Sequence, residues 1–101
     1  MAIKSSTTND GREVTIEVSG SFDFSQHQAF RLICEKAGTE VQRFIIDLGA
    51  AEYIDSSALG MLLVLRDRVG GNRDKVRLTR VRPEVKKIFE IANFDQLFTI
   101  V

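Results

Sequence analysis

The sequence predicts a single α/β domain, in which helices pack against a mixed and mostly parallel β-sheet in the order ββαβαβαβ. Three observations lead to this fold class: a hairpin pattern opens the chain, a short buried strand lies near its middle, and helical and strand patterns alternate after it. The chain has 101 residues, and typical domains hold about 100 to 150 residues. We therefore expect residues 1–101 to form one domain.

The first two strands are indicated by an alternating pattern and a turn. Apolar and polar residues alternate over residues 13–18, which is typical of a half-buried strand. Asn9-Asp10-Gly11 is a turn signal, so residues 3–8 are expected to pair with this strand as a hairpin. Gly20 is expected to end the second strand.

A helix over residues 25–37 is expected next, because apolar residues recur there at helical spacing: Ala29, Phe30, Ile33, Cys34 and Ala37. Ser25 is the expected N-cap and Gly38 the expected stop. Residues 44–48 are rich in aromatic and β-branched side chains, which indicates a strand buried on both faces between helices. Residues 49–54 are expected to form a loop.

The second half of the chain indicates two more helices and two short strands. Residues 57–69 contain one helix breaker, Gly60, and precede the stop signal Gly70-Gly71-Asn72, so they predict a helix. Alternation over residues 76–81 indicates a strand, and residues 97–101 can supply a last one. Between them, Pro83 stands where a helix takes its first residue, and an apolar stripe follows it at Val85, Ile88, Phe89 and Ala92.

Charge and composition exclude several classes of function. Lysine and arginine number 14, as do aspartate and glutamate, so no net field attracts nucleic acid or an acidic membrane. The single cysteine, Cys34, excludes an intramolecular disulfide framework and a multi-cysteine zinc site, and we expect it to fill apolar space. No signal-peptide pattern opens the chain, and the longest apolar stretch, residues 61–65, is too short to span a bilayer. We expect a cytoplasmic protein without a metal or cofactor.

A hydrolytic enzyme is a weak alternative that rests on Ser56, Asp55 and His27. The segment around Ser56 lacks the glycines of a G-x-S-x-G nucleophile elbow. His27 is expected to be an exposed residue in the first turn of its helix, so the spacing predicts no catalytic triad. A basic stretch without interleaved aromatic residues is expected to form a solvated strand face; it contains Arg77, Arg80 and Arg82.

The segment before the second predicted helix carries the most functional information. Asp55-Ser56-Ser57 directly precedes that helix, and Asp55 or Ser56 can cap it by accepting hydrogen bonds from free amides, which contributes about 1 kcal/mol. Capping does not explain why apolar residues lie on both sides of the helix, with one set at Ala58, Leu62, Leu65 and Val69 and another at Leu63 and Val64. Such a helix is either deeply buried or offers surface to a partner. A serine at its start is suited to phosphorylation, because a helix N-terminus tolerates an anion.

These residues resemble the STAS domain of bacterial anti-sigma factor antagonists. Ile54-Asp55-Ser56-Ser57-Ala58-Leu59-Gly60 is similar to the phosphorylation motif of that family, Asp-Ser-Ser/Thr-Gly-Leu-Gly, and Gly20-Ser21-Phe22-Asp23 is similar to its Gly-x-x-Asp element. The element order matches over essentially the whole chain, so a STAS-like sandwich is the implied fold. The chain departs from the family pattern at Ala58, where glycine is common, and at Ser21-Phe22, where a charged residue often precedes an aliphatic one.

The resemblance implies which residues carry the function. Ser56 is the implied phosphorylation site, Asp55 would position its hydroxyl, and Asp23 lies in the loop that flanks it. Ser57 is implied as a neighbouring cap residue, and the contact surface of the second helix would include Leu59, Gly60 and Leu63. The implied partners are an anti-sigma factor that is also an ATP-dependent serine kinase, and a metal-dependent serine phosphatase.

We therefore expect an anti-sigma factor antagonist that binds the anti-sigma factor when Ser56 is unphosphorylated and releases it when Ser56 is phosphorylated. The chain itself is expected to catalyse no reaction, to be monomeric when free, and to have no nucleic-acid or membrane partner. The alternative is a STAS subunit of a constitutive assembly, such as a transporter accessory or a stress-sensing scaffold, in which the same helix is packed permanently.

Overall fold

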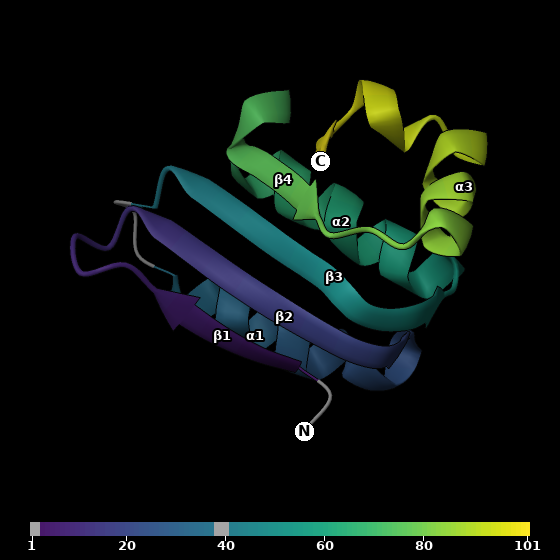
Figure 1. Ribbon diagram of the computed structural model, residues 1–101. Coiled ribbons are helices and arrows are strands. Elements are labelled where there is room, and N and C mark those ends of the chain that lie inside the picture. The colour runs from purple at the N-terminus through teal and green to yellow at the C-terminus, as the bar shows by residue number, and fades with distance from the viewer. Residues whose placement is uncertain (1–2, 38–40) are drawn as a thin grey trace.

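The computed structural model describes residues 3–37 and 41–101 (Figure 1). The described strands are β1 (Ile3–Thr7), β2 (Glu13–Phe22), β3 (Arg43–Ile54), β4 (Val76–Thr79) and β5 (Thr99–Ile100). The described helices are α1 (His27–Lys36), α2 (Ser56–Arg68) and α3 (Pro83–Ile91), with short 3-10 segments η1 (Phe24–Gln26), η2 (Arg73–Lys75) and η3 (Phe94–Gln96). The predicted α/β class and the order ββαβαβαβ are confirmed. The expected helix stop at Gly38 lies outside the described residues.

The described strands form one mixed sheet in the order β1-β2-β3-β4-β5. β1 and β2 are antiparallel, as the hairpin pattern predicts, and the pairs β2–β3, β3–β4 and β4–β5 are parallel. Helices α1 and α2 lie together on one face of the sheet (Figure 1). Ile16, Ile46 and Leu78 are register neighbours on β2, β3 and β4, and each is fully buried in the core.

The prediction that residues 44–48 are buried on both faces is wrong. Phe44, Ile46 and Leu48 are buried, whereas Ile45 and Asp47 between them are only half-buried. Residues 44–48 are mostly apolar because β3 is the middle strand of the sheet. The second face of the strand is less buried because α1 and α2 cover only one face of the sheet.

Both central strands are longer than the sequence pattern predicts. Gly20 does not end β2, because the strand passes through it with a positive φ of 73° and continues to Phe22. The expected loop at residues 49–54 is instead the second half of β3. The two extensions pair with each other, Phe22 opposite Ile54, across register shifts of the bulge type. Inter-strand pairing therefore keeps extended a segment whose own composition favours a loop.

The ends of several elements differ from expectation for local reasons. Asp23, not Ser25, caps the first helical turn, and the α-helix proper starts at His27. β4 ends at Thr79 rather than Val81, because Arg80 adopts a left-handed φ of 55°. β5 is shortened to Thr99–Ile100 by the preceding 3-10 turn. In the described part of the chain, no helix has the length and apolar character that a membrane crossing requires.

The basic residues Arg77, Arg80 and Arg82 do not form the purely solvated strand face that the sequence suggests, since Arg77 lies in β4 and is half-buried, and Arg80 and Arg82 follow the strand. Arg80 Nη1 donates to Asp47 Oδ2 over 3.2 Å, and Arg82 Nε donates to the Gly49 carbonyl oxygen over 3.0 Å. A Cβ on Gly49 would lie 2.7 Å from Arg80 Cζ, so the absence of a side chain leaves room for the guanidinium. Arg80 and Arg82 therefore tie the loop after β4 to β3.

Candidate functional site

The carboxyl ends of β2 and β3 are paired, and they bring the motifs around Asp23 and Asp55 together at one end of the sheet. The chain leaves β2 after Phe22 and enters the Asp23 turn, and it leaves β3 after Ile54 and enters Asp55. The Asp55 backbone N–H donates to the Phe22 carbonyl oxygen over 3.3 Å, which fixes one turn against the other. Asp23 and Asp55 are therefore held in neighbouring turns, as the resemblance implies.

Ser56 is the first residue of α2, and its side chain is exposed. Asp55 caps the helix, since its Oδ1 accepts a hydrogen bond from the Ala58 N–H over 3.0 Å. This settles the choice between Asp55 and Ser56 as the cap. Within the described residues, no hydrogen bond engages the Ser56 hydroxyl. The amides of the first turn lack intrahelical acceptors and the helix dipole is positive there, so an anion on Ser56 would be tolerated.

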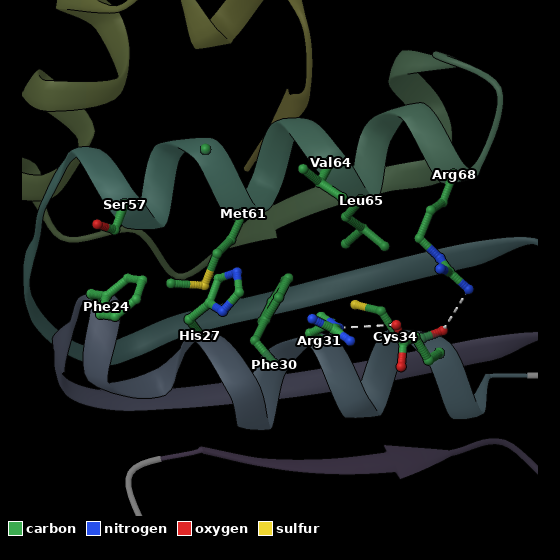
Figure 2. Close-up of a pocket in the computed structure, with 12 residues that line it drawn as sticks. Phe24, His27, Phe30, Arg31, Cys34, Ser57, Met61, Val64, Leu65 and Arg68 are labelled. Carbon is green, nitrogen blue, oxygen red and sulfur yellow. Dashed lines mark hydrogen bonds and ion pairs between the residues drawn. The ribbon is translucent and has the colours of Figure 1, made fainter.

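Ser57 is the second residue of α2, so it belongs to the first helical turn and is not the cap. Its side chain is half-buried. Its side chain faces α1 (Figure 2). Of the two serines, Ser56 is thus the more exposed.

Asp23 is the centre of a small hydrogen-bonded turn. Its carboxylate accepts hydrogen bonds from the Ser25 hydroxyl, from the Ser25 N–H over 3.0 Å and from the Ser21 hydroxyl over 3.0 Å. These donors lower the pKa of Asp23 below its ordinary value of 3.8, and the hydrogen bond from the Ser25 hydroxyl has the largest effect. Asp23 therefore stays ionised and shapes the loop beside Ser56.

Replacing Ser25 with alanine is expected to raise the pKa of Asp23 toward 3.8, because the strongest donor to the ionised carboxylate is lost. Since folding lowers this pKa, the stabilisation by Asp23 is present above 3.8 and is lost as the pH falls through the lowered value. An NMR titration of the Asp23 carboxyl carbon measures the change. Ser5→Ala, an exposed serine on β1, is the control and should leave the titration unchanged. A Ser25→Ala curve that overlays the wild type would contradict the assigned cause.

Exposed apolar side chains accompany Ser56 at this end of the sheet and along α2. Phe24 is 69% exposed and Tyr53 is 55% exposed, and Val64 and Leu63 are 62% and 39% exposed on α2. Of the contact residues implied by the resemblance, Gly60 and Leu63 are exposed, while Leu59 is partly buried against the core. The exposure of Val64 agrees with the second apolar set that the sequence places on this helix, whereas Phe24 and Tyr53 were not predicted as site residues, because sequence periodicity shows that a residue is apolar and not that the fold leaves it exposed.

A cavity of about 400 Å³ lies between the η1–α1 segment and α2. Figure 2 shows Met61 reaching from α2 toward His27 and Phe30 of α1. His27 is half-buried there rather than exposed as predicted, and its ring stacks on Phe24 at 5.4 Å between centroids. Cys34 is buried in the same wall, and burial raises the pKa of its thiol to about 11. The thiol is therefore protonated, in agreement with the expected apolar filling.

The residues of the weak enzyme alternative are not joined in a triad. The Asp55 carboxylate is used by the Ala58 amide, and His27 stacks on Phe24 at the cavity wall. In residues 3–37 and 41–101, no group of three or more His, Cys, Asp or Glu side chains is placed to hold a metal ion.

Comparison with known proteins agrees with this architecture. The family model of the STAS domain matches residues 4–101. The chain is 49% identical over 100 residues to the STAS-domain containing protein PA14_20770 of Pseudomonas aeruginosa strain UCBPP-PA14, with 99% of both chains covered.

Solved structures show the same fold at low sequence identity. The anti-sigma factor antagonist SpoIIAA in its unphosphorylated form is 18% identical, with 99% of this chain and 87% of that chain covered and a TM-score of 0.77. The phosphorylated Bacillus SpoIIAA gives 18% identity, 99% and 91% coverage and a TM-score of 0.76. A sulfate transporter family protein from Wolinella succinogenes gives 15% identity, 90% and 73% coverage and a TM-score of 0.73. Because the family model spans nearly the whole chain and a full-length relative is closely similar, the chain belongs to the STAS domain family.

Proposed function

We propose that this protein is a cytoplasmic, bacterial anti-sigma factor antagonist switched by phosphorylation of Ser56. The unmodified protein binds an anti-sigma factor and thereby frees a sigma factor, so the output is a change in transcription. The observation that carries the proposal is the exposed Ser56 hydroxyl at the start of α2, at the end of the sheet that also presents Phe24 and Tyr53. A hydroxyl among exposed apolar side chains suits a protein interface more than it suits open water.

Phosphorylation would act on this surface through charge. A phosphate adds about −1.5 to −2 charges at neutral pH, and the carboxylates of Asp23, Glu52 and Asp55 lie in the neighbouring turns or strand end. The phosphate is compatible with the positive end of α2, so the domain stays folded while its docking edge becomes strongly negative. The kinase partner supplies ATP, magnesium and the general base, and a serine phosphatase removes the group. The chain contributes no catalytic group or cofactor, and the free form is proposed to be a monomer.

Intact-mass spectrometry of the protein purified from its native cells tests this assignment. We expect a species heavier by about 80 Da, the mass of one phosphoryl group, that disappears on phosphatase treatment and maps to Ser56. Ser56→Ala should lack the heavier species, whereas Ser57→Ala should retain it. A modification that persists in Ser56→Ala and is lost in Ser57→Ala would contradict the choice of acceptor, and an unmodified protein under all growth conditions would contradict the switch.

The competing function is that of a permanent STAS subunit in a larger assembly. Protein purified from the native cells, with and without phosphatase treatment, distinguishes this function from a phosphorylation switch. The solved STAS-fold protein of the sulfate transporter family shows that this fold occurs outside the antagonists. A permanent subunit would co-purify with one partner in a constant ratio before and after phosphatase treatment. A phosphorylation switch requires that the ratio rise when the phosphate is removed.

A further inference from the structure

A long groove between α1 and α2 is not explained by the phosphorylation switch. Its walls come from residues 24–35 of η1 and α1 and from residues 57–68 of α2. Ser57 lies toward Phe24 at one end, and at the other end Arg68 Nη2 donates to the Cys34 carbonyl oxygen over 3.3 Å (Figure 2). The two helices therefore run in the same direction, and α2 rises roughly 16 Å between the two ends at 1.5 Å per residue. The groove favours an elongated occupant.

The walls of the groove are apolar, and its size is that of a ligand site. Phe30, Met61 and Leu65 are buried in the walls, and Val64 is exposed at the rim. The volume of about 400 Å³ lies within the range of about 300 to 1,000 Å³ that is usual for small-molecule sites. Gly60 lines the groove as well, and a Cβ built on it would meet no atom within 4 Å. Its missing side chain keeps this part of the groove open.

Charge is concentrated at one end of the groove. Arg31 and Glu35 from α1 and Arg68 from α2 line this part of the groove, which gives two positive charges and one negative charge, a net charge of +1. Arg31 uses Nε for Glu35 at 3.0 Å, and Arg68 uses Nη2 for the Cys34 carbonyl oxygen. Among the described residues, the other N–H groups of these two guanidinium ions have no hydrogen-bond partner, so they are available to a ligand. Guanidinium groups bind carboxylates with strong, charge-assisted hydrogen bonds.

We propose that this groove binds an unbranched medium-chain acyl carboxylate. The alkyl chain lies along the open side of the groove past Gly60 and Val64, over the buried Phe30 and Met61, and the carboxylate is held by Arg31 and Arg68. The length and apolar walls of the groove select the chain, and the excess positive charge at one end selects the anionic head. The ligand would bind beside Ser57, one residue from the phosphorylation site, but the site is complete in this chain and needs no protein partner.

Titration of the nitrogen-15-labelled protein with dodecanoate, kept below its micelle concentration, tests the proposal. We expect saturable amide shifts confined to groove residues such as Phe30, Gly60 and Val64. Dodecanol and dodecyltrimethylammonium carry the same chain with a neutral and a cationic head, and each should bind at least about tenfold more weakly, because a charged hydrogen-bonded contact is lost. Three ligands of equal affinity, shifts centred on the exposed Ile91 of α3, or no saturable shift would each overturn the proposal.

Two variants and a control locate the ligand. Gly60→Leu fills the groove where space is open, so it should fold with an unchanged or higher Tm and bind dodecanoate at least about tenfold more weakly. Arg68→Gln should weaken binding of dodecanoate but not of dodecanol. Leu32→Ala removes an exposed apolar side chain of α1 outside the groove and should leave both affinities unchanged. A folded Gly60→Leu protein that binds dodecanoate as the wild type does would place the ligand elsewhere, and the Arg68→Gln result remains decisive if Gly60→Leu does not fold.

Discussion

Replacing Ser56 with glutamate is expected to weaken binding of the anti-sigma factor at least about a hundredfold, whereas Ser56→Ala should bind like the unphosphorylated wild type. The side chain is exposed at an edge with apolar neighbours, so a docked partner would bury it. An unpaired charge buried in an interface costs several kcal/mol, and 3 kcal/mol corresponds to about a hundredfold in Kd. Isothermal titration calorimetry with the kinase that phosphorylates Ser56 measures the three affinities.

A matched control separates this local effect from a general effect of negative charge. Ser6 is an exposed serine on β1, at the far edge of the sheet from β5, and Ser6→Glu adds the same charge there. We expect its affinity to stay within about twofold of the wild type, because surface charges farther apart than the Debye length are screened. Full affinity in Ser56→Glu, or an equal loss in Ser6→Glu, would contradict a switch at Ser56.

Replacing Phe89 with alanine is expected to lower the free energy of unfolding by about 3 to 5 kcal/mol, since truncating a buried phenylalanine leaves a cavity. Phe89 of α3 is fully buried, and its ring stacks on Phe94 with centroids 5.7 Å apart. Phe94 in turn lies 5.1 Å from the ring of Phe98, so the substitution removes one end of a continuous aromatic cluster. A domain with about 5 to 15 kcal/mol of total stability would lose a large part of it.

Urea denaturation followed by circular dichroism measures this loss. Ile91→Ala is the matched control, because Ile91 belongs to the same helix and is 76% exposed. Surface substitutions of this kind change stability by about 0.5 kcal/mol or less. Similar losses in both variants would contradict a special contribution of the buried aromatic cluster, because alanine raises helix propensity at both positions.

The sequence predicts the strands and helices well where local periodicity and tertiary packing agree. The stripe of α3 is an example, since Pro83 starts the helix and Val85 and Phe89 are buried as predicted. It predicts the second half of β3 poorly, because Gly49 and the small residues after it have no strand pattern of their own. That segment is a strand because β2 pairs with it as far as Ile54. Pairing between segments that lie far apart in the sequence does not appear in the local pattern of residues.

The sequence likewise predicts some features of the candidate site and misses others. Ser56, Asp55 and Asp23 stand in motifs that resemble those of the STAS family, and that resemblance implies that they lie in neighbouring turns, as the structure shows. It does not predict the capping role of Asp23, because Ser25 is equally suitable by residue type and only the backbone geometry favours the aspartate. The exposure of Phe24 and Tyr53 is not predicted either, because a phenylalanine or tyrosine in a sequence is more often buried than exposed.

The hydrogen bond between Asp55 and Phe22 bears on the energetics of recognition. Both turns of the proposed docking surface are anchored to the long β2–β3 ladder, so they would have little conformational freedom to lose when a partner binds. Preorganised surfaces gain affinity because less entropy is lost on association. For a given contact area, such a rigid surface can therefore support a higher affinity than a flexible one.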